Sequence, residues 1–410
     1  MAKLKLAILA THPVHYQIDW FRAVARRPDV EVTVFFGSDF GLKEEIDPTF
    51  QHTVRWYDSS LLEGLHHKFL RNYPLSRSPS SIWNPLNPSI FAELRRGRYD
   101  AIWIHGYASV TNYLAYLAAL LTGTPVLFRG DAVLRHDWPK WLKLFKSVFL
   151  RTFFRGVAAV LPVGTASAEF YRYYGVEPER TFLTPYAVNN EQLMALADML
   201  RPRRAELRRR LGLDGLPSFL MVAKLIDRKR PMDLLEAYRR LEQPAAIVYA
   251  GDGPELPRLR DYAATHGLRN VHFLGFLRPE LLPEIYAATD VFVLASAYDP
   301  WGLVVNEAMC YGLPIVATSG VGATRDLVRN GENGFVYPVG DVEALAGILR
   351  SLASDPRSCE AMGVRSRAMI SAWSLESSTE GIVNALRSVA SRATPAGRSL
   401  DVNPPSHTSS

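Results

Sequence analysis

DVFVLASAYDPWGLVVNEAMCYGLPIVAT, residues 290–318, is the stretch with the clearest structural pattern in this chain. Its apolar run Val291–Ala295 is typical of a short buried parallel strand. After a loop, apolar residues at helical spacing predict a helix over Gly302–Tyr311, and Gly312 ends it. Pro314–Thr318 is a second run rich in β-branched residues. This order of strand, loop, helix and strand predicts a parallel α/β sheet.

The loop before the expected helix has the features of an anion-binding site. It follows the carboxyl end of a parallel strand, where open α/β sheets bind their ligands. The helix N-terminus offers free backbone N–H groups from about Trp301 to Leu303, and Gly302 allows the backbone to approach a ligand closely. We therefore expect a diphosphate to bind at this helix end.

Two carboxylates flank this expected site. Asp299 lies on the loop and Glu307 on the helix, with seven residues between them. Carboxylates accept hydrogen bonds from hydroxyls, so we expect Asp299 to bind a sugar and Glu307 to bind a ribose on either side of the diphosphate. The spacing also permits a simpler interpretation, in which Asp299 only caps the helix and Glu307 is a solvated helix residue.

The segment DPWGLVVNEAM, residues 299–309, resembles the E-x7-E motif of retaining GT-B glycosyltransferases of family 4, also called group 1. Glu307 matches the second glutamate of the motif, and Asp299 stands in place of the first. This replacement keeps the charge but shortens its reach by one methylene, which puts the contact with the donor sugar in question. The resemblance implies two Rossmann-like domains facing each other across a cleft. It also implies hexosyl transfer, with retention, from a nucleotide-diphosphate sugar.

Other segments of 219–336 match motifs of the same family in the family's order. Lys224 and Lys229 stand where the family's GRLxxxKG motif has its cations, which neutralise the diphosphate leaving group. A solvated basic turn is the alternative. The GDGP turn with Gly251 and Gly253 resembles the family's turn beside the nucleotide, and Phe276 lies in the segment that holds the base. SGVGATRD, residues 319–326, resembles the family's GGxPE loop.

The first half of the chain resembles the family less closely. Leu4–Thr11 and Val30–Phe36 are expected to be strands of a βαβ unit, and its first turn lacks the GxGxxG fingerprint of a dinucleotide site. We predict that the residues at the ends of the first-half strands lie on the acceptor side, with Asp131 also taking part in catalysis. A solvated turn for the histidines and a structural Arg–Asp pair are the alternatives. These acceptor-side residues are His12, His15, His105 and Arg129.

We expect four regions along the chain. Residues 1–187 form an N-terminal Rossmann-like acceptor domain, and 188–370 form a C-terminal Rossmann-like donor domain. Residues 371–392 form a helix that crosses back to the first domain. Residues 393–410 are rich in Ser, Pro and Thr and are expected to be disordered.

Composition and charge narrow the functional classes. The net charge of +6 permits anionic partners, but no nucleic-acid-binding motif accompanies it, so we expect none of that class. The two cysteines belong to no CxxC or Cys/His cluster, which favours a reducing compartment and no zinc. No apolar run reaches the length of a membrane span. We expect a cytoplasmic enzyme that needs no metal or cofactor, with the nucleotide sugar as co-substrate. The six arginines of 201–210 are interpreted as a solvated helix face.

The segment WPKWLKLFKSVFLRTFFR, residues 138–155, predicts an amphipathic helix. Its aromatic residues share one face and its basic residues the other, as in helices that lie at a membrane interface. We predict peripheral contact with the inner membrane. The alternative is a domain helix whose aromatic face packs on its own sheet.

We therefore predict a glycosyltransferase that acts on a saccharide or lipid-linked acceptor in cell-envelope polysaccharide or glycolipid synthesis. A sugar-nucleotide-binding protein with little turnover is a second hypothesis, because Asp299 is shortened and RGDA, residues 129–132, replaces the His often present in the family. A sugar phosphorylase of the same fold is a third.

Overall fold

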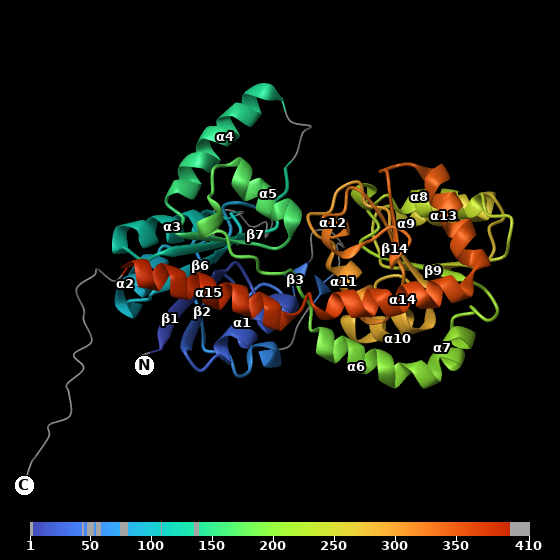
Figure 1. The fold of residues 1–410 in the computed structure, drawn as a ribbon, viewed down its shortest axis with the longest axis horizontal. Coiled ribbons are helices and arrows are strands. Elements are labelled where there is room, and N and C mark those ends of the chain that lie inside the picture. Colours follow the sequence, from blue (N-terminus) through green and yellow to red (C-terminus); the bar gives the residue numbers. More distant parts are fainter. Residues whose placement is uncertain are drawn as a thin grey trace, which may run out of the picture.

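The computed structural model describes residues 3–42, 45–46, 53–54, 59–73, 81–107, 109–134 and 139–393. Trp138 and the expected tail beyond Ala393 lie outside this part. Two parallel sheets lie side by side, one in each half of the chain (Figure 1). The prediction of two Rossmann-like domains is confirmed.

The first domain is built on a six-stranded parallel sheet of order β5-β2-β1-β6-β7-β8. A separate antiparallel pair consists of β3 (Glu45–Ile46) and β4 (Thr53–Val54). The strands of the main sheet are β1 (Leu4–Ala10), β2 (Val30–Phe36), β5 (His67–Phe69), β6 (Ala101–His105), β7 (Val126–Gly130) and β8 (Ala159–Pro162). The helices are α1 (His15–Ala25), α2 (Ile90–Gly97), α3 (Val110–Thr122), α4 (Lys140–Arg155) and α5 (Thr165–Tyr173).

The second domain repeats this plan with the order β11-β10-β9-β12-β13-β14. Its strands are β9 (Ser218–Val222), β10 (Ala246–Ala250), β11 (Val271–Phe273), β12 (Val291–Leu294), β13 (Ile315–Thr318) and β14 (Gly334–Tyr337). Its helices are α6 (Asn190–Leu200), α7 (Arg204–Arg210), α8 (Pro231–Arg239), α9 (Leu256–Thr265), α10 (Leu282–Ala288), α11 (Leu303–Cys310), α12 (Thr324–Leu327), α13 (Val342–Ser354) and α14 (Pro356–Ser371).

The central strands are apolar because helices cover both faces of each sheet. Every residue of β9, β10, β12 and β13 is buried, and so are the last five of β1. Strands that are buried on both faces are expected to be continuous apolar runs rather than alternating ones. The apolar run in the quoted stretch therefore lies at the centre of the second sheet, as β12.

Both sheets reverse their strand order at one point, and that point positions the candidate site. The reversal lies between β1 and β6 in the first domain and between β9 and β12 in the second. In open parallel sheets, the crevice for ligands forms at such a point, just outside the carboxyl ends of the strands. The loops after β9 and β12 carry the segments that match family motifs.

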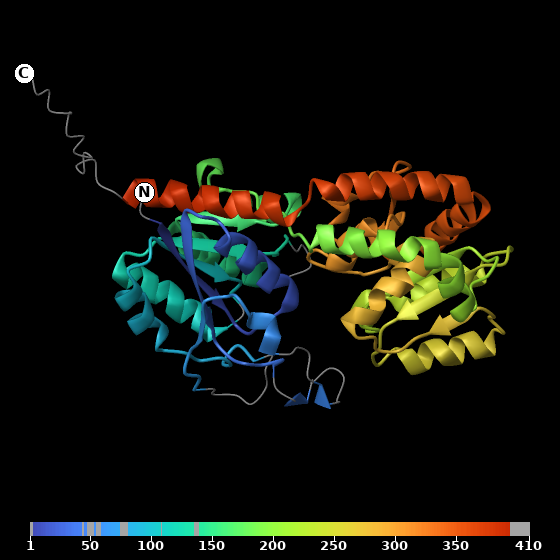
Figure 2. The same ribbon diagram turned by 90° about the horizontal axis from the view of Figure 1, so that it is seen from below.

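The end of the chain joins the two domains. Helix α14 lies on the second domain, and α15 (Leu375–Ala393) continues from it across the first (Figures 1 and 2). Arg27 next to α1 pairs with Glu380 of α15 at 2.5 Å. Gly381 of α15 has no room for a side chain, because a Cβ there would lie 2.0 Å from the carbonyl oxygen of Leu183. Helix α15 therefore packs tightly on the linker between the domains.

Candidate active site

The loop after β12 is held rigidly by the loop after β13. The backbone N–H of Asp299 donates to the Gly320 carbonyl, and the N–H of Gly322 donates to the Asp299 carbonyl, both at 2.9 Å. A Cβ on Gly320 would lie 2.3 Å from the Ala297 carbonyl oxygen, and one on Gly322 would lie 2.0 Å from that of Pro300. The glycines of SGVGATRD thus allow the two loops to pack backbone against backbone, which fixes the position of Asp299.

Lys229 and Asp299 form an ion pair at the reversal point of the second sheet. Lys229 ends the short 3-10 helix that follows β9, and Asp299 follows β12. The side chains are only 14% and 12% exposed, so solvent screens the pair weakly. The motifs predict both groups at one site, but nothing in their spacing indicates this direct contact. Lys224 lies on the same loop as Lys229 and is exposed.

Glu307 is partly buried on α11 and is held by a hydrogen bond from a neighbouring helix. Its Oε2 accepts a hydrogen bond of 2.8 Å from the hydroxyl of Tyr286, which belongs to α10. Burial raises the pKa of Glu307 to about 7, and the Tyr286 hydroxyl lowers it by a smaller amount. The simpler interpretation of a solvated helix residue is therefore wrong. Tyr286 could not be predicted as a neighbour of Glu307 from the sequence, because no local spacing connects α10 with α11.

The start of α11 is shaped by Gly302. This residue has a φ of 92°, a left-handed conformation that favours glycine, and no side chain caps the helix. The helix therefore begins at Leu303, one residue later than expected. The Trp301 side chain points away from this helix end: its Nε1 donates to Asn306 at 2.9 Å, and its ring stacks on Trp373 at 5.6 Å. Only the backbone of Trp301 remains available for the anion-binding role predicted for it.

The glycines of the GDGP turn bring the loops after β10 and β9 together. A Cβ on Gly251 would lie 1.9 Å from the Ala223 carbonyl oxygen, and one on Gly253 would lie 2.4 Å from that of Leu225. Their contribution to this site is therefore to support the loop that carries the two lysines. Phe276, which follows β11, has a side chain that is 41% exposed. The contacts of these residues with a nucleotide stay predictions.

Asp131 directly follows β7, and its charge interacts with that of Asp299 in the second domain. Burial raises the pKa of Asp131, and the charge of Asp299 raises it further. Tyr107 lies nearby, since Asp131 and Tyr298 add to the burial that raises its pKa to about 12. The ends of β6, β7 and β12 thus bring carboxylates and tyrosines from both domains close together.

Arg129 lies beneath this group of carboxylates and tyrosines and is not part of it. Its side chain is fully buried, and its guanidinium lies 3.8 Å from the ring centroid of Trp20. It donates to the carbonyls of Thr184 and Pro185 in the interdomain linker. These contacts make Arg129 a residue that positions the linker, and they leave its predicted acceptor-side role indirect.

Burial lowers the pKa of each of the three histidines predicted for the acceptor side. Burial, and the Arg129 charge to a smaller degree, lower the pKa of His105 to about 3. Burial also lowers the pKa values of His12 and His15. His15 begins α1 and is close enough to Glu280 of the second domain for that charge to raise its pKa slightly. His12 contacts the Thr11 hydroxyl through Nδ1 at 3.1 Å.

A second set of contacts between the domains comes from Arg325 and Asp326, where the loop of residues 319–326 departs from the family's GGxPE motif. Arg325 donates two hydrogen bonds, of 2.6 and 2.7 Å, to the carboxylate of Glu169 on α5. The Asp326 carboxylate accepts from the backbone N–H of Thr165 at 3.0 Å, at the start of the same helix. The unusual Arg325-Asp326 pair was the sequence signal for this contact. Among the described residues, no group of three His, Cys, Asp or Glu side chains could hold a metal ion.

Comparisons with known proteins place the chain in a family. Two Rossmann-like domains with a site at their facing strand ends define the GT-B class of fold. The family model described as "Glycosyl transferases group 1" matches residues 203–369, and the "Glycosyl transferase 4-like domain" model matches 14–187. The two models together span both domains, so the chain belongs to the group 1 glycosyltransferase family.

Curated relatives match parts of the chain. Over 234 residues, it is 33% identical to the D-inositol 3-phosphate glycosyltransferase of Geodermatophilus obscurus, covering 53% of this chain and 49% of that protein. Over 164 residues, it is 34% identical to the alpha-D-kanosaminyltransferase of Streptomyces kanamyceticus, covering 39% and 42%. The chain thus spans less than half the length of these two relatives. It is 28% identical over 337 residues to a GDP-mannose-dependent phosphatidylinositol monomannoside mannosyltransferase of Mycobacterium tuberculosis, covering 77% and 83%.

Solved structures share the fold over almost the whole chain. Anabaena Alr3699/HepE in complex with UDP has a TM-score of 0.72 at 21% identity, covering 94% of this chain and 100% of that one. WaaG, described as a glycosyltransferase involved in lipopolysaccharide biosynthesis, has a TM-score of 0.65 at 17% identity, covering 92% and 98%. At these identities the likeness establishes the GT-B fold alone.

Proposed function

We propose that this protein is a retaining glycosyltransferase that moves a hexosyl group from a nucleotide-diphosphate sugar to a saccharide or lipid-linked acceptor. The observation that carries the proposal is the Lys229–Asp299 pair at the reversal point of the second sheet, with Asp131 of the first domain facing it. This arrangement combines a cation and a carboxylate from the ends of two neighbouring strands with a second carboxylate from the other domain.

On the donor side, Lys229 would bind the diphosphate together with exposed Lys224. Charge-assisted contacts of this kind stabilise the negative charge that develops on a leaving group. The backbone N–H groups at the start of α11, behind Gly302, add further donors. A diphosphate competes with Asp299 for Lys229, and Asp299 is then able to accept a hydrogen bond from the transferred sugar. Because lysines neutralise the diphosphate here, we propose that no metal or cofactor is needed.

The nucleoside would lie along the second domain. Glu307 would accept hydrogen bonds from the ribose hydroxyls, with Tyr286 holding its carboxylate in place. Exposed Phe276 and the backbone around it would hold the base. The GDP-mannose dependence of the mycobacterial relative and the UDP in the Anabaena structure show that related proteins use different bases. We therefore leave the base to experiment.

The transfer itself would occur on one face of the sugar. The acceptor hydroxyl attacks the anomeric carbon on the side from which the diphosphate leaves, so the new C–O bond forms as the bond to the diphosphate breaks. The acceptor proton passes to a diphosphate oxygen. Asp131 would orient the acceptor hydroxyl, and His12 and His15 would border the acceptor side as neutral groups. His105 and Arg129 would act behind them as positioning residues.

The purified protein should be incubated with UDP-, GDP- and ADP-sugars, with melting temperature and donor hydrolysis as readouts. We expect stabilisation and slow hydrolysis with one nucleotide class, and both should decrease in Lys229→Ala. The anomeric coupling in an NMR spectrum of the product should report retention, and an inverted product would contradict the mechanism. Stabilisation without turnover on any acceptor would favour a binding protein. Release of sugar only when inorganic phosphate is added would favour a phosphorylase.

We also propose that α4 brings the enzyme to the inner leaflet, where a lipid-linked acceptor of envelope synthesis lies. The helix projects from the first domain (Figure 1). Its last turns are packed, with Phe153 and Phe154 buried, so the expected aromatic face is divided. Earlier in the helix, apolar side chains that lie close together on its surface are 43–70% exposed: Leu144, Phe145, Val148 and Phe149.

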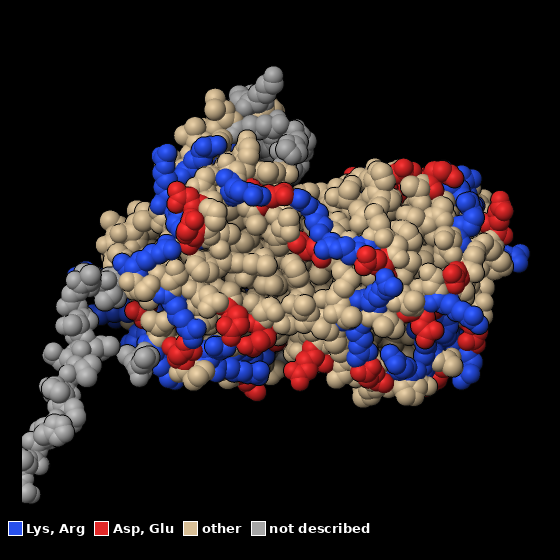
Figure 3. All heavy atoms as spheres, in the orientation of Figure 1, with Lys and Arg blue, Asp and Glu red and all other residues tan. Residues whose placement is uncertain are grey.

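Charge supports the same interpretation of α4. Lys and Arg side chains gather on the projecting part of the first domain that contains this helix (Figure 3). Each cation near an anionic surface contributes about 1 kcal/mol, which salt weakens, whereas inserted aromatic rings add attachment that salt does not remove. Within the described residues, no helix is both long and apolar enough to cross a bilayer. Peripheral contact is therefore the form of attachment that we propose.

Co-sedimentation with phosphatidylglycerol vesicles tests the membrane proposal. We expect binding at low salt and partial release at high salt, with loss of the salt-sensitive part when Lys140, Lys143 and Lys146 are changed to Glu. Phe145→Ser should weaken the part that salt does not remove. Leu121→Ser on α3 is the matched control, because that side chain is 67% exposed but lies on another helix. Absence of binding at low salt, or equal binding by the triple variant, would contradict the proposal.

A further inference from the structure

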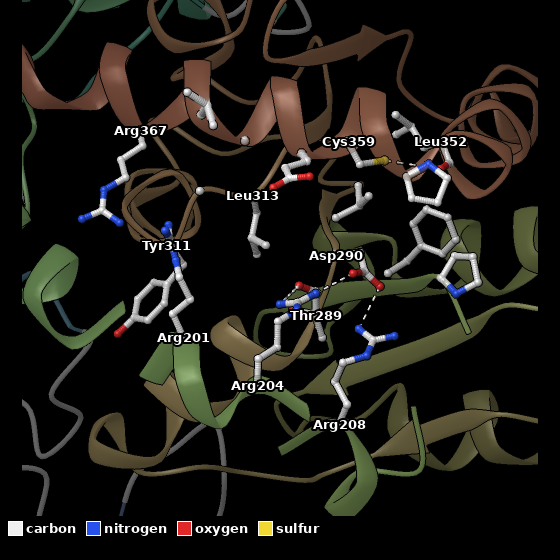
Figure 4. Close-up of a pocket in the computed structure, with 18 of the residues that line it drawn as sticks. Arg201, Arg204, Arg208, Thr289, Asp290, Tyr311, Leu313, Leu352, Cys359 and Arg367 are labelled. Atoms are coloured by element: carbon white, nitrogen blue, oxygen red, sulfur yellow. Dashed lines mark hydrogen bonds and ion pairs between the residues drawn. The ribbon is translucent and has the colours of Figure 1, made fainter. Parts of the chain in front are cut away.

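The second domain has a cavity of about 990 Å³ near the amino ends of its central strands, whereas the candidate active site lies at their carboxyl ends (Figure 4). It is bordered by α6, α7 and α14 and by the residues that precede β9 and β12. Asp290, which lines it, comes directly before β12, whereas Asp299 follows that strand. Because four strand residues span roughly 13 Å, the cavity and the site are separate.

Four arginines line this cavity, and two of them are locked in place. Arg204 and Arg208 both pair with Asp290, at 2.5 and 3.0 Å. Each also donates to backbone carbonyls at the end of α10. The interpretation of the 201–210 arginines as a solvated helix face is therefore wrong for these two, because both form part of a cavity wall. Two guanidinium groups on one carboxylate leave an excess of positive charge.

The charges of the other two arginines both act on one carboxylate, that of Asp198. Arg367 of α14 pairs with Asp198, a side chain that is 55% exposed. Arg201 also lines the cavity, beside Tyr311, and its side chain forms no hydrogen bond or ion pair with any residue that the structure describes (Figure 4). A guanidinium offers five N–H donors in a planar fork that matches phosphate oxygens. Since the four arginines face only three carboxylates, the cavity favours an anion.

The remaining walls are apolar. Leu216, Leu313 and Leu352 line the cavity together with Cys359 and Val364, and the Val364 side chain is 67% exposed. A cavity with a cationic side and an apolar side fits a molecule that has both a phosphate and an apolar or ring-shaped body. Free inorganic phosphate would use only the first of these.

We propose that this cavity is a binding site for a small phosphorylated molecule, with Arg201 and Arg367 as its phosphate-binding residues. We further propose that its occupancy changes nucleotide affinity, a part that rests on the proposed function. Tyr311 lines the cavity, and its ring stacks on that of Tyr286 with centroids 5.2 Å apart. The Tyr286 hydroxyl donates to Glu307, the residue assigned to the ribose. One stacked pair of rings therefore connects the cavity wall with the donor side.

Calorimetric titration of the full chain with phenyl phosphate tests the binding site. We expect phenyl phosphate to bind at least about tenfold more tightly than inorganic phosphate, since only the former contacts the apolar wall. Arg201→Gln combined with Arg367→Gln should reduce phenyl phosphate affinity by about tenfold or more. Arg209→Gln is the matched control, because it removes the same charge from α7 outside the cavity lining. Melting temperatures would verify that all variants are folded.

Two results would overturn the site. One is equal phenyl phosphate affinity in the wild type and the Arg201/Arg367 double variant. The other is loss of phenyl phosphate binding in Lys229→Ala, which would place the ligand in the cleft instead. Equal affinity for phenyl phosphate and inorganic phosphate would overturn the apolar part of the proposal.

The effect on nucleotide affinity is tested separately. The dissociation constant of UDP, or of the nucleotide that binds best, should change at least about threefold when phenyl phosphate is present. Tyr311→Leu should keep phenyl phosphate binding but remove this effect. An unchanged nucleotide affinity would overturn the coupling and leave the site. If no nucleotide binds at all, the proposed function fails, while phenyl phosphate binding at the cavity still supports the site.

Discussion

The two domains have the same strand order but build the ends of their central strands from different chemistry. In the second domain, Lys229 and Asp299 meet as a charged pair on loops that close backbone packing holds rigid. In the first domain, the corresponding strand ends carry the histidines His12 and His105, whose pKa values burial lowers, and aromatic rings around Arg129. A charged site suits an anionic leaving group, and a neutral, aromatic site suits a polyhydroxylated acceptor.

The region between the domains joins these two kinds of site. The rings of Trp20 and Tyr186 lie 5.0 Å apart, those of Tyr186 and Trp301 lie 6.0 Å apart, and Trp301 stacks on Trp373. Trp20 also donates from Nε1 to the Ala187 carbonyl at 2.9 Å. The motif residue Trp301 therefore contributes to the joint between the domains.

The largest expected effect comes from the charged pair. Lys229→Ala should lower turnover by about a hundredfold or more, because loss of an electrostatic contact to a leaving group costs about 2–4 kcal/mol of transition-state stabilisation. Steady-state kinetics measure the turnover, and Lys68→Ala in the first domain is the control. Lys224→Ala should act in the same direction. Wild-type turnover in both Lys224→Ala and Lys229→Ala would remove the leaving-group assignment.

The facing carboxylates test whether both domains take part in the transfer step. Asp299→Asn and Asp131→Asn should each lower transfer by roughly tenfold to a hundredfold, within the range of a lost transition-state contact. Nucleotide affinity should not fall in either variant, since neither group is assigned to the nucleotide and Asp299→Asn removes the charge that competes with the diphosphate for Lys229. Transfer rates and UDP titrations measure the two quantities. Undiminished product from Asp299→Asn would mean that the motif match is misleading.

Glu307 offers a smaller, pH-dependent effect in the second domain. Its pKa of about 7 lies above the usual range, so the folded protein keeps a proton that the unfolded chain has lost. The stabilising effect of this proton is complete below the ordinary pKa and declines as pH rises through about 7. The free energy of unfolding should therefore fall by about 1–3 kcal/mol between pH 5 and 8 relative to Glu307→Gln.

The comparison with Glu307→Gln is needed because buried histidines act in the opposite direction. The lowered pKa of His105 makes stability rise with pH over part of the same range. Urea unfolding at several pH values measures the difference, with exposed Glu191→Gln as the control. The same pH trend in wild type and Glu307→Gln would contradict the buried-carboxyl assignment. Glu307→Gln should also weaken nucleotide binding measurably.

The smallest expected effect concerns the Arg325–Glu169 ion pair, which bridges the two domains. Arg325→Ala should cost less than about 1 kcal/mol of stability, since both side chains of its pair with Glu169 are partly exposed and salt screens them. Turnover should stay within about threefold of the wild type. Thermal unfolding measures the stability and steady-state kinetics measure the turnover. Arg329→Ala, four residues further along the chain, is the control. A tenfold loss of turnover would instead make the bridge part of the closed, active arrangement.

The quoted stretch was sufficient to predict the fold class because its signals are local. An apolar run flanked by turns, a helical spacing and a glycine at the helix start are properties of neighbouring residues. They correspond to β12, α11 and β13 with boundaries shifted by at most one residue. The grouping of Lys229, Asp299 and Glu307 in one domain also followed from short motifs, since each motif marks the end of one strand.

The tertiary structure decided which side chains touch. The Lys229–Asp299 pair, the Tyr286–Glu307 hydrogen bond and the Arg204–Asp290 pair join residues 70, 21 and 86 positions apart. No periodicity connects such residues, because their contact depends on how loops and helices pack around a sheet. Burial has the same origin: it lowers the pKa of His105 and raises that of Glu307, and the same packing encloses the Arg129 side chain. The sequence by itself determined which segments form strands and helices and which charged residues are available. Packing alone determined the partners of those charged residues and their protonation.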